Sequence, residues 1–189
     1  MVPLAVMRSL RSALSALSVA LLLLSVSSAA QVRTADPIKR GLSRSEFPRT
    51  IQITDNVYGY EDFHSLGMTT VSLFVVGNDG VLLADGQGSP AATQKLLDAI
   101  AKVTPKPVKW YIVGSDHGDH TAGNSVLPKD TTYIVSKASK AQMKLAAPAM
   151  TSDKEVVNVG GIEVQALNLG RATPAVILWS TCPNRRSSS

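Results

Sequence analysis

The most constraining feature of this chain is a polar loop that follows a short apolar run. The run Trp110–Val113 is typical of a buried strand, and Ser115–His120 follows it with two histidines and two aspartates. In α/β sheets, the loops at strand ends are where binding and catalytic side chains gather. Imidazole and carboxylate groups are also preferred ligands of divalent transition metals. The loop therefore predicts a functional site, with a metal ion as its first candidate occupant.

The sequence on either side of this loop predicts a mixed α/β fold. Two apolar runs, at residues 71–76 and 81–84, are joined by Gly77-Asn78-Asp79-Gly80, whose asparagine and glycines favour a hairpin turn. After Ser89-Pro90, the pattern predicts helices at residues 90–103, directly after Thr121 and at residues 137–146. It predicts strands at residues 109–113, 132–135, 155–159 and 162–169. Hairpins followed by alternating strands and helices indicate layers of sheet and helix.

Three segments together resemble the metallo-beta-lactamase superfamily. Ser115–His120 resembles its H-x-H-x-D-H signature, and Thr121-Ala122-Gly123-Asn124 resembles the T-G-G-N that opens the following helix. Upstream, Val81–Gly86 resembles a strand that ends in a supporting aspartate. The resemblance extends roughly from residue 51 to residue 172. It implies an αββα sandwich, here with an incomplete second half, and zinc at one edge of the sandwich.

The resemblance also assigns roles to individual residues. His117 matches a ligand of the first zinc, whereas Asp119 and His120 match ligands of the second. Asp119 also matches the catalytic residue that orients the metal-bound hydroxide. Asp85 matches the supporting aspartate; the alternative is a strand-end carboxylate that caps backbone amides. The implied chemistry is hydrolysis, in which one or two zinc ions lower the pKa of bound water and polarise the scissile carbonyl.

The chain departs from the family pattern at several positions. Ser115 stands where the signature has its first histidine, and a neutral hydroxyl is a poor zinc ligand, so Ser115 is expected beside the metal. No histidine follows His120. His64, after Tyr60, is expected to be a loop residue rather than a ligand. One ligand then remains for the first zinc and two for the second, whereas catalytic zinc normally has three. The chain as given is therefore expected to be inactive.

The residues after Ala172 fit the resemblance better in another reading frame. When the codons of Ala172–Asn184 are read two nucleotides further along, and their degenerate third bases are chosen freely, they can encode H-T-G-G-D-L-V-V-Y-L-P-E. We therefore interpret residues 50–172 as a partial metallo-beta-lactamase-like domain that is truncated by a frameshift, and residues 173–189 as an aberrant tail. The alternative is that degenerate codons permit many strings. A zinc ligand at Cys182 is a less favoured rival idea.

The N-terminal residues predict export. Arg8 and Arg11 precede the apolar run 13–26, and Ser28-Ala29-Ala30 supplies small residues for cleavage, so residues 1–30 are interpreted as a signal peptide. An uncleaved anchor is the alternative. Residues 31–49 are polar and read as a linker or flexible arm. A periplasmic or extracellular protein without membrane attachment after cleavage is expected.

Charge and cysteine content exclude several classes of protein. The formal net charge of +5 depends on arginines near the two ends of the chain, namely Arg8, Arg11, Arg185 and Arg186. Without a basic stripe and with 5% aromatic residues, nucleic-acid binding is not expected. Cys182 is the sole cysteine, so no intramolecular disulfide can form.

Two functions remain open. The leading interpretation is an exported zinc-dependent hydrolase that attacks an ester, thioester or amide-type bond of a small-molecule substrate. The alternative is a non-catalytic, metal-poor binding or accessory protein on the same fold, which Ser115 favours because a frameshift does not explain that substitution. A structural envelope protein has only the export signal in its favour. The substrate and the oligomeric state stay open.

Overall fold

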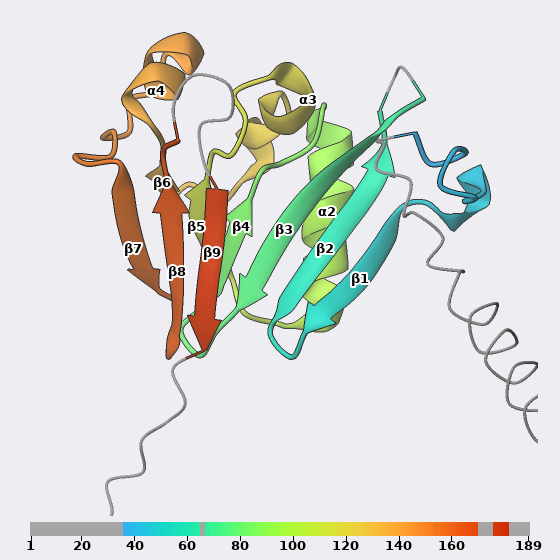
Figure 1. Cartoon of the computed structure of the whole chain (residues 1–189), viewed down its shortest axis with the longest axis horizontal. Helices are drawn as coiled ribbons and strands as arrows, with labels where there is room; N and C mark the ends of the chain where they lie inside the picture. Colours follow the sequence, from blue (N-terminus) through green and yellow to red (C-terminus); the bar gives the residue numbers. More distant parts are fainter. Residues whose placement is uncertain (1–35, 65–66, 170–175, 182–189) are drawn as a thin grey trace, which may run out of the picture. The chain divides into compact units, whose positions relative to one another are not determined.

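The computed structural model describes residues 36–64, 67–169 and 176–181, which all belong to one compact unit. A six-stranded sheet has the order β1-β2-β3-β4-β5-β6 (Figure 1). Its first four strands are antiparallel neighbours, whereas β4, β5 and β6 run parallel. The strands are β1 (Arg49–Thr54), β2 (Val57–Phe63), β3 (Thr69–Val76), β4 (Val81–Ala84), β5 (Val108–Ile112) and β6 (Thr132–Ile134).

A second, antiparallel sheet of three strands has the order β7-β8-β9. Its strands are β7 (Lys154–Asn158), β8 (Ile162–Leu167) and β9 (Val176–Thr181). The helical segments are η1 (Arg44–Glu46), α2 (Pro90–Val103), α3 (Gly118–Thr121), η2 (Asn124–Val126) and α4 (Lys137–Met143). No helix in the described ranges is both long and apolar enough to span a lipid bilayer.

Helix α2 forms where its sequence signals predicted it. The Ser89 hydroxyl caps the helix by accepting a hydrogen bond from the backbone N–H of Ala92, and Pro90 occupies the first turn, where its missing N–H is harmless. Leu96 and Ile100, one turn apart, are both buried. The helix therefore buries one face, as its periodicity requires.

The six-stranded sheet carries one hydrophobic core on each face, because side chains alternate along its strands. Leu82 and Ala84 of β4 belong to a cluster that includes Val164 of β8. Leu83, between them, belongs to the cluster on the opposite face with Leu96 of α2. The described layers are therefore helix α2, the six-stranded sheet and the three-stranded sheet. The predicted mixed α/β class is confirmed.

The two sheets are in backbone contact at the β3–β4 hairpin turn. The backbone N–H of Asn78 donates a hydrogen bond to the Gly160 carbonyl, with 3.2 Å between nitrogen and oxygen. A Cβ atom on Gly77 would lie 1.3 Å from the Val159 carbonyl oxygen. Only glycine allows this approach, so the predicted hairpin turn also sets the contact between the sheets.

The three-stranded sheet leaves part of this face exposed. Ile51 and Val71 lie on the face that carries Leu73, because Gly59 pairs with both Ile51 and Leu73. Their exposed fractions are 43% and 50%, and Ile53 is 50% exposed. The β1–β3 end of the sheet therefore presents apolar side chains to solvent.

One structural expectation, the position of the helix that follows the polar loop, differs from the structure. The short helix predicted after Thr121 is instead α3, which ends at Thr121, followed by η2. In α3, the Thr121 hydroxyl donates a hydrogen bond to the His117 carbonyl, one turn earlier in the helix. The interpretation of residues 31–49 as a linker stays a prediction; in the described part of that range, Arg40 and Arg49 both bind the carboxylate of Glu61.

Several sequence predictions lie outside the described residues. The proposed signal peptide, residues 1–30, is among them, as are most of the tail and the segment 170–175. Within the predicted aberrant tail, Val176–Thr181 forms β9 beside β8. The frameshift hypothesis stays a prediction.

Replacing Gly77 by alanine is expected to separate the sheets locally and to lower the free energy of unfolding by about 1–3 kcal/mol. The matched control is Gly118→Ala, because a Cβ atom there would meet nothing within 4 Å. Urea unfolding of both variants measures the difference. Equal stability of the two variants would contradict the close approach of the sheets.

Glu61 is expected to make stability depend on acidity. Burial alone would raise its pKa, but the Thr69 hydroxyl and the guanidinium groups of Arg49 and Arg40 outweigh burial, so the pKa lies below its ordinary value of 4.5. The stabilisation is therefore complete above about pH 4.5 and is lost as the pH falls through the lowered pKa.

The variant Glu61→Gln tests this dependence. At pH 7 it is expected to lower the free energy of unfolding by about 3 kcal/mol, because the two guanidinium groups lose their counter-charge. The difference from the wild type should narrow below pH 4.5. Glu155→Gln, on β7, serves as the control. A difference that stays constant from neutral to acidic pH would refute the assignment.

Candidate functional site

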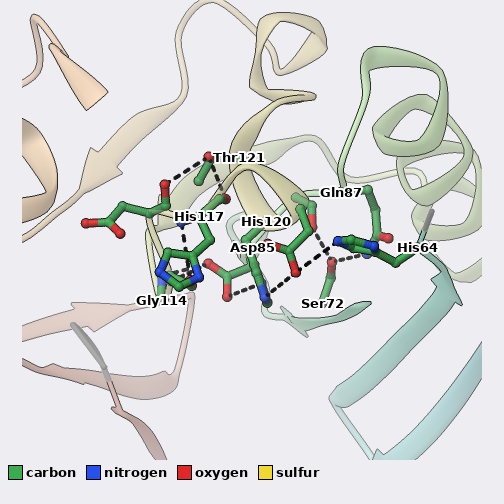
Figure 2. Close-up of polar contacts among 12 residues, drawn as sticks. His64, Ser72, Asp85, Gln87, Gly114, His117, His120 and Thr121 are labelled. Carbon is green, nitrogen blue, oxygen red and sulfur yellow. Dashed lines mark hydrogen bonds and ion pairs between the residues drawn. The ribbon is translucent and has the colours of Figure 1, made fainter. Parts of the chain in front are cut away.

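The candidate site lies at the edge of the six-stranded sheet where β2, β4 and β5 end. Asp85 follows β4, Gly114 and Ser115 follow β5, and His64 follows β2. These three strands run in the same direction, so the residues after them meet at one edge. Figure 2 shows Asp85 beside Gly114 and His120, with His64 approaching from another element.

Asp85 connects the ends of the two central strands. Its Oδ1 accepts hydrogen bonds from the backbone N–H groups of Gly114, at 2.7 Å, and Ser115, at 3.1 Å. Its Oδ2 lies 3.1 Å from Nδ1 of His120. One carboxylate therefore caps two backbone amides and also contacts the histidine, while its role beside a metal stays a prediction. Asp85 does so with φ at 60°, a left-handed conformation that aspartate tolerates better than most residues.

The His120 imidazole is held at both nitrogens. When Nδ1 carries its proton towards Asp85, Nε2 is left facing Asp119 Oδ2 at 3.4 Å. The hydrogen bond to Asp85 raises the pKa of His120, and the negative charges of Asp85 and Asp119 raise it further. Burial lowers this pKa, but the raising effects are larger, so the pKa of His120 lies above its ordinary value. A carboxylate that fixes one ring nitrogen and leaves the other available is the arrangement found behind histidine ligands of metals.

Asp119 lies between two imidazoles. Its Oδ2 is 3.4 Å from Nε2 of His120 and 3.5 Å from Nε2 of His64. All three side chains are between 20% and 29% exposed, so solvent reaches them. His64 is a loop residue, as predicted, but the loop carries it to the site. The sequence feature that could have identified His64 as a site residue is its position at the end of β2, a strand that runs parallel to β4.

His117 and Ser115 are placed differently. Ser115 Oγ lies 3.4 Å from the backbone nitrogen of His117, so this serine supports the loop that turns into α3. His117 is the exposed N-cap residue of α3. Within the described ranges, no hydrogen bond or ion pair joins the His117 imidazole to Asp119 or His120. Hydrogen bonds and ion pairs therefore link Asp85, Asp119, His120 and His64.

Tyr111, a buried residue that the sequence did not indicate as part of the site, supports the loop from its buried side. Tyr111 Oη accepts a hydrogen bond from the Gly86 N–H at 2.9 Å and lies 3.2 Å from the His120 carbonyl oxygen. It also donates towards Asn124 Oδ1 at 2.9 Å. Burial, with a contribution from the charge of Asp85, raises its pKa, so the phenol stays protonated.

The side chains fit a zinc ion only in part. Two ligands of one tetrahedral zinc lie about 3.3 Å apart, so Asp119 Oδ2 and His120 Nε2, at 3.4 Å, have the spacing of a shared pair. Across the described parts of the chain, however, no group of three or more His, Cys, Asp or Glu side chains is arranged to hold a metal ion. Catalytic zinc normally has three protein ligands. The described residues therefore do not fit a complete zinc centre.

Comparison with solved structures identifies the fold. The structure is similar to the "Metallo-beta-lactamase from Pontibacter korlensis", with a TM-score of 0.59 and 19% identity over 68% of this chain and 65% of that chain. It is also similar to metallo-beta-lactamase IND-7, with a TM-score of 0.57 and 20% identity over 69% of this chain and 66% of that one. For TMB-1 the TM-score is 0.50, with 21% identity over 61% and 57% of the two chains.

The chain thus spans between 57% and 66% of the length of these three structures. No protein-family model matches the sequence, and no curated protein matches it.

The anchoring role of Asp85 predicts the effect of Asp85→Asn. Asparagine also tolerates the left-handed conformation, so this change removes the charge without adding backbone strain. It should lower the free energy of unfolding by about 1–3 kcal/mol and shift the amide NMR signals of Gly114, Ser115 and His120.

The control is Asp116→Asn, an equivalent change in the same loop, which should leave the signals of Gly114 and His120 in place. Unchanged signals in Asp85→Asn would show that the carboxylate does not anchor the loop.

Proposed function

Because the chain has the metallo-beta-lactamase fold, we propose that it belongs to a hydrolase whose site is the sheet edge around Asp119. The observation that carries the proposal is the arrangement of Asp119 against His120, which Asp85 orients from behind. The proposed substrate is a small molecule with an ester, thioester or amide-type bond. Export to the periplasm or the exterior is part of the proposal and rests on residues 1–30 alone.

The roles of the side chains follow from their contacts. Asp85 fixes the ring of His120 and the backbone of Gly114 and Ser115, so the loop is preorganised before a substrate arrives. Asp119 is 29% exposed, so its carboxylate can accept a hydrogen bond from a water molecule and orient that molecule for attack. In this proposal Asp119 is the catalytic residue and Asp85 positions it through His120.

We propose zinc as the cofactor, with Asp119 and His120 as ligands of one ion. His117 is the proposed ligand of a second ion. When bound, zinc would supply Lewis-acid activation of water and of the scissile carbonyl. The described residues do not complete this set of ligands. We expect low zinc affinity and little or no hydrolysis from this chain alone.

The second candidate function is a metal-poor binding or accessory protein. Two observations favour it. Ser115 serves the loop backbone rather than a metal, and the carboxylate of Asp119 already has His64 and His120 beside it. Such a protein would keep the fold and the loop and would bind a partner or small molecule without hydrolysing it.

Zinc titration of the purified chain tests the proposal. The wild type should bind zinc, and Asp85→Asn should bind it about 10–100-fold more weakly, because the supporting carboxylate is lost. Asp119→Asn and His120→Gln should weaken binding at least as much, and the control Asp116→Asn should not.

Hydrolysis is measured on the same proteins with a chromogenic ester, a thioester and a lactam. A zinc-dependent rate that disappears in Asp119→Asn supports the hydrolase, even when the rate is low. Zinc binding without hydrolysis favours the binding protein for this chain. Zinc binding that is identical in the wild type and in all the variants would contradict the proposed ligands.

A further inference from the structure

Strand β1 lies at one end of the six-stranded sheet, beside β2 (Figure 1). Within the described parts of the chain, no strand pairs with it on the side away from β2. The outer edge of such a strand is a template on which another strand can pair. Natural edge strands often carry lysine or proline, which hinder that pairing, but Arg49–Thr54 contains neither residue.

The sequence of this strand is palindromic. Thr50-Ile51-Gln52-Ile53-Thr54 reads the same in both directions, with Gln52 at its centre. When two copies pair antiparallel about Gln52, each residue therefore lies opposite a residue of its own type. Threonine faces threonine, isoleucine faces isoleucine, and the two Gln52 side chains face each other. A two-fold dimer requires a self-complementary surface of this kind.

The residues that flank the palindrome carry opposite charges. Arg49 precedes it and Asp55 follows it, so the same pairing places Arg49 opposite Asp55 of the second copy at both ends. Arg49 shares the carboxylate of Glu61 with Arg40, so two positive charges lie beside one negative charge there. Asp55 of the second copy would offset the remaining positive charge. Opposite charges directly across two strands stabilise the pair.

The pairing also covers apolar surface. Ile51 and Ile53 are 43% and 50% exposed, and their contact across the two copies would remove part of that surface from water. The register of β1 with β2 shifts between Gln52 and Thr54, which marks a β-bulge. Both isoleucines nevertheless lie on the face of Gly59, which pairs with Ile51 and whose Cβ position is 3.6 Å from Ile53 Cδ1.

We propose that two copies of this chain associate through β1, in antiparallel register about Gln52, and form a two-fold dimer whose sheet continues across both copies. The cross-strand pairs are Thr50 with Thr54, Ile51 with Ile53 and Arg49 with Asp55, each formed twice by symmetry. Strand β1 carries none of the residues of the candidate site, so the dimer does not depend on the proposed hydrolase.

Sedimentation velocity of the full chain over a range of concentrations tests the association. Monomer and dimer are expected, with a plateau at the dimer. Ile53→Lys should weaken dimerisation at least about 10-fold, because it places a charge in the paired surface. The matched control is Val156→Lys, which adds the same charge at a 49% exposed valine of β7, an edge strand of the other sheet. It should dimerise like the wild type.

The contribution of charge is measured with Asp55→Asn. This change should weaken dimerisation by about 2–10-fold, because each dimer loses two exposed ion pairs. The thermal midpoints of all three variants, taken at a concentration where the wild type is monomeric, should match that of the wild type. They separate a loss of association from a loss of folding.

Cysteine cross-linking tests the register independently of affinity. In a Cys182→Ser background, Gln52→Cys should form a disulfide-linked dimer on mild oxidation, because directly opposite residues have Cβ atoms about 4.5–5.5 Å apart. Thr50→Cys should not cross-link with itself, because the two copies of this residue would lie about 13 Å apart along the strands. A mixture of Thr50→Cys and Thr54→Cys should cross-link.

Several results would overturn the proposal. They are a chain that stays monomeric at every concentration, larger species without a plateau at the dimer, or equal weakening by Ile53→Lys and Val156→Lys. Cross-linking of Thr50→Cys alone that is as strong as that of Gln52→Cys would overturn the register.

Discussion

The carboxylate of Asp85 is the interaction on which the candidate site depends. The parallel pairing of β4 and β5 brings the two loops that follow these strands to one edge of the sheet. Strand pairing alone does not fix the positions of the side chains in those loops. Asp85 does so with one oxygen on two backbone N–H groups and the other on His120. The backbone geometry of the loop and the direction of the imidazole are thereby set by the same charged group, and Tyr111 supports both from the buried side.

Local patterns predicted the fold better than they predicted the site. The hairpin at Gly77–Gly80 and helix α2 follow from turn residues, capping and periodicity, which act over a few neighbours. The contact of Asp85 with His120 could be anticipated only through resemblance, and its contacts with Gly114, Ser115 and His120 are made 29, 30 and 35 residues away in the sequence. His64 and Tyr111 were not recognised as site residues, because their contacts depend on strand direction and register. No local pattern contains that information.

The fold indicates a broad class of function, whereas the chemistry has to be argued from the side chains of the site. The fold matches solved metallo-beta-lactamases, while the low identity leaves chemistry to be argued from the side chains themselves. Those side chains provide one well-spaced pair, Asp119 and His120, with a supporting carboxylate behind it. Ser115 shows how a position can keep a structural contact with the loop without offering a metal ligand. The two proposed functions, hydrolysis and binding, therefore differ in the number of metal ligands that they require rather than in the scaffold.

The exposed apolar end of the six-stranded sheet affects how the protein folds and accumulates in a cell. Ile51, Ile53 and Val71 expose apolar side chains near one another, and β1 is an edge strand of the sheet. During synthesis such a surface attracts other chains as readily as it attracts its own, so self-association competes with folding and grows with concentration. The abundance of this chain would then be governed by chaperones and proteases, in addition to its equilibrium stability.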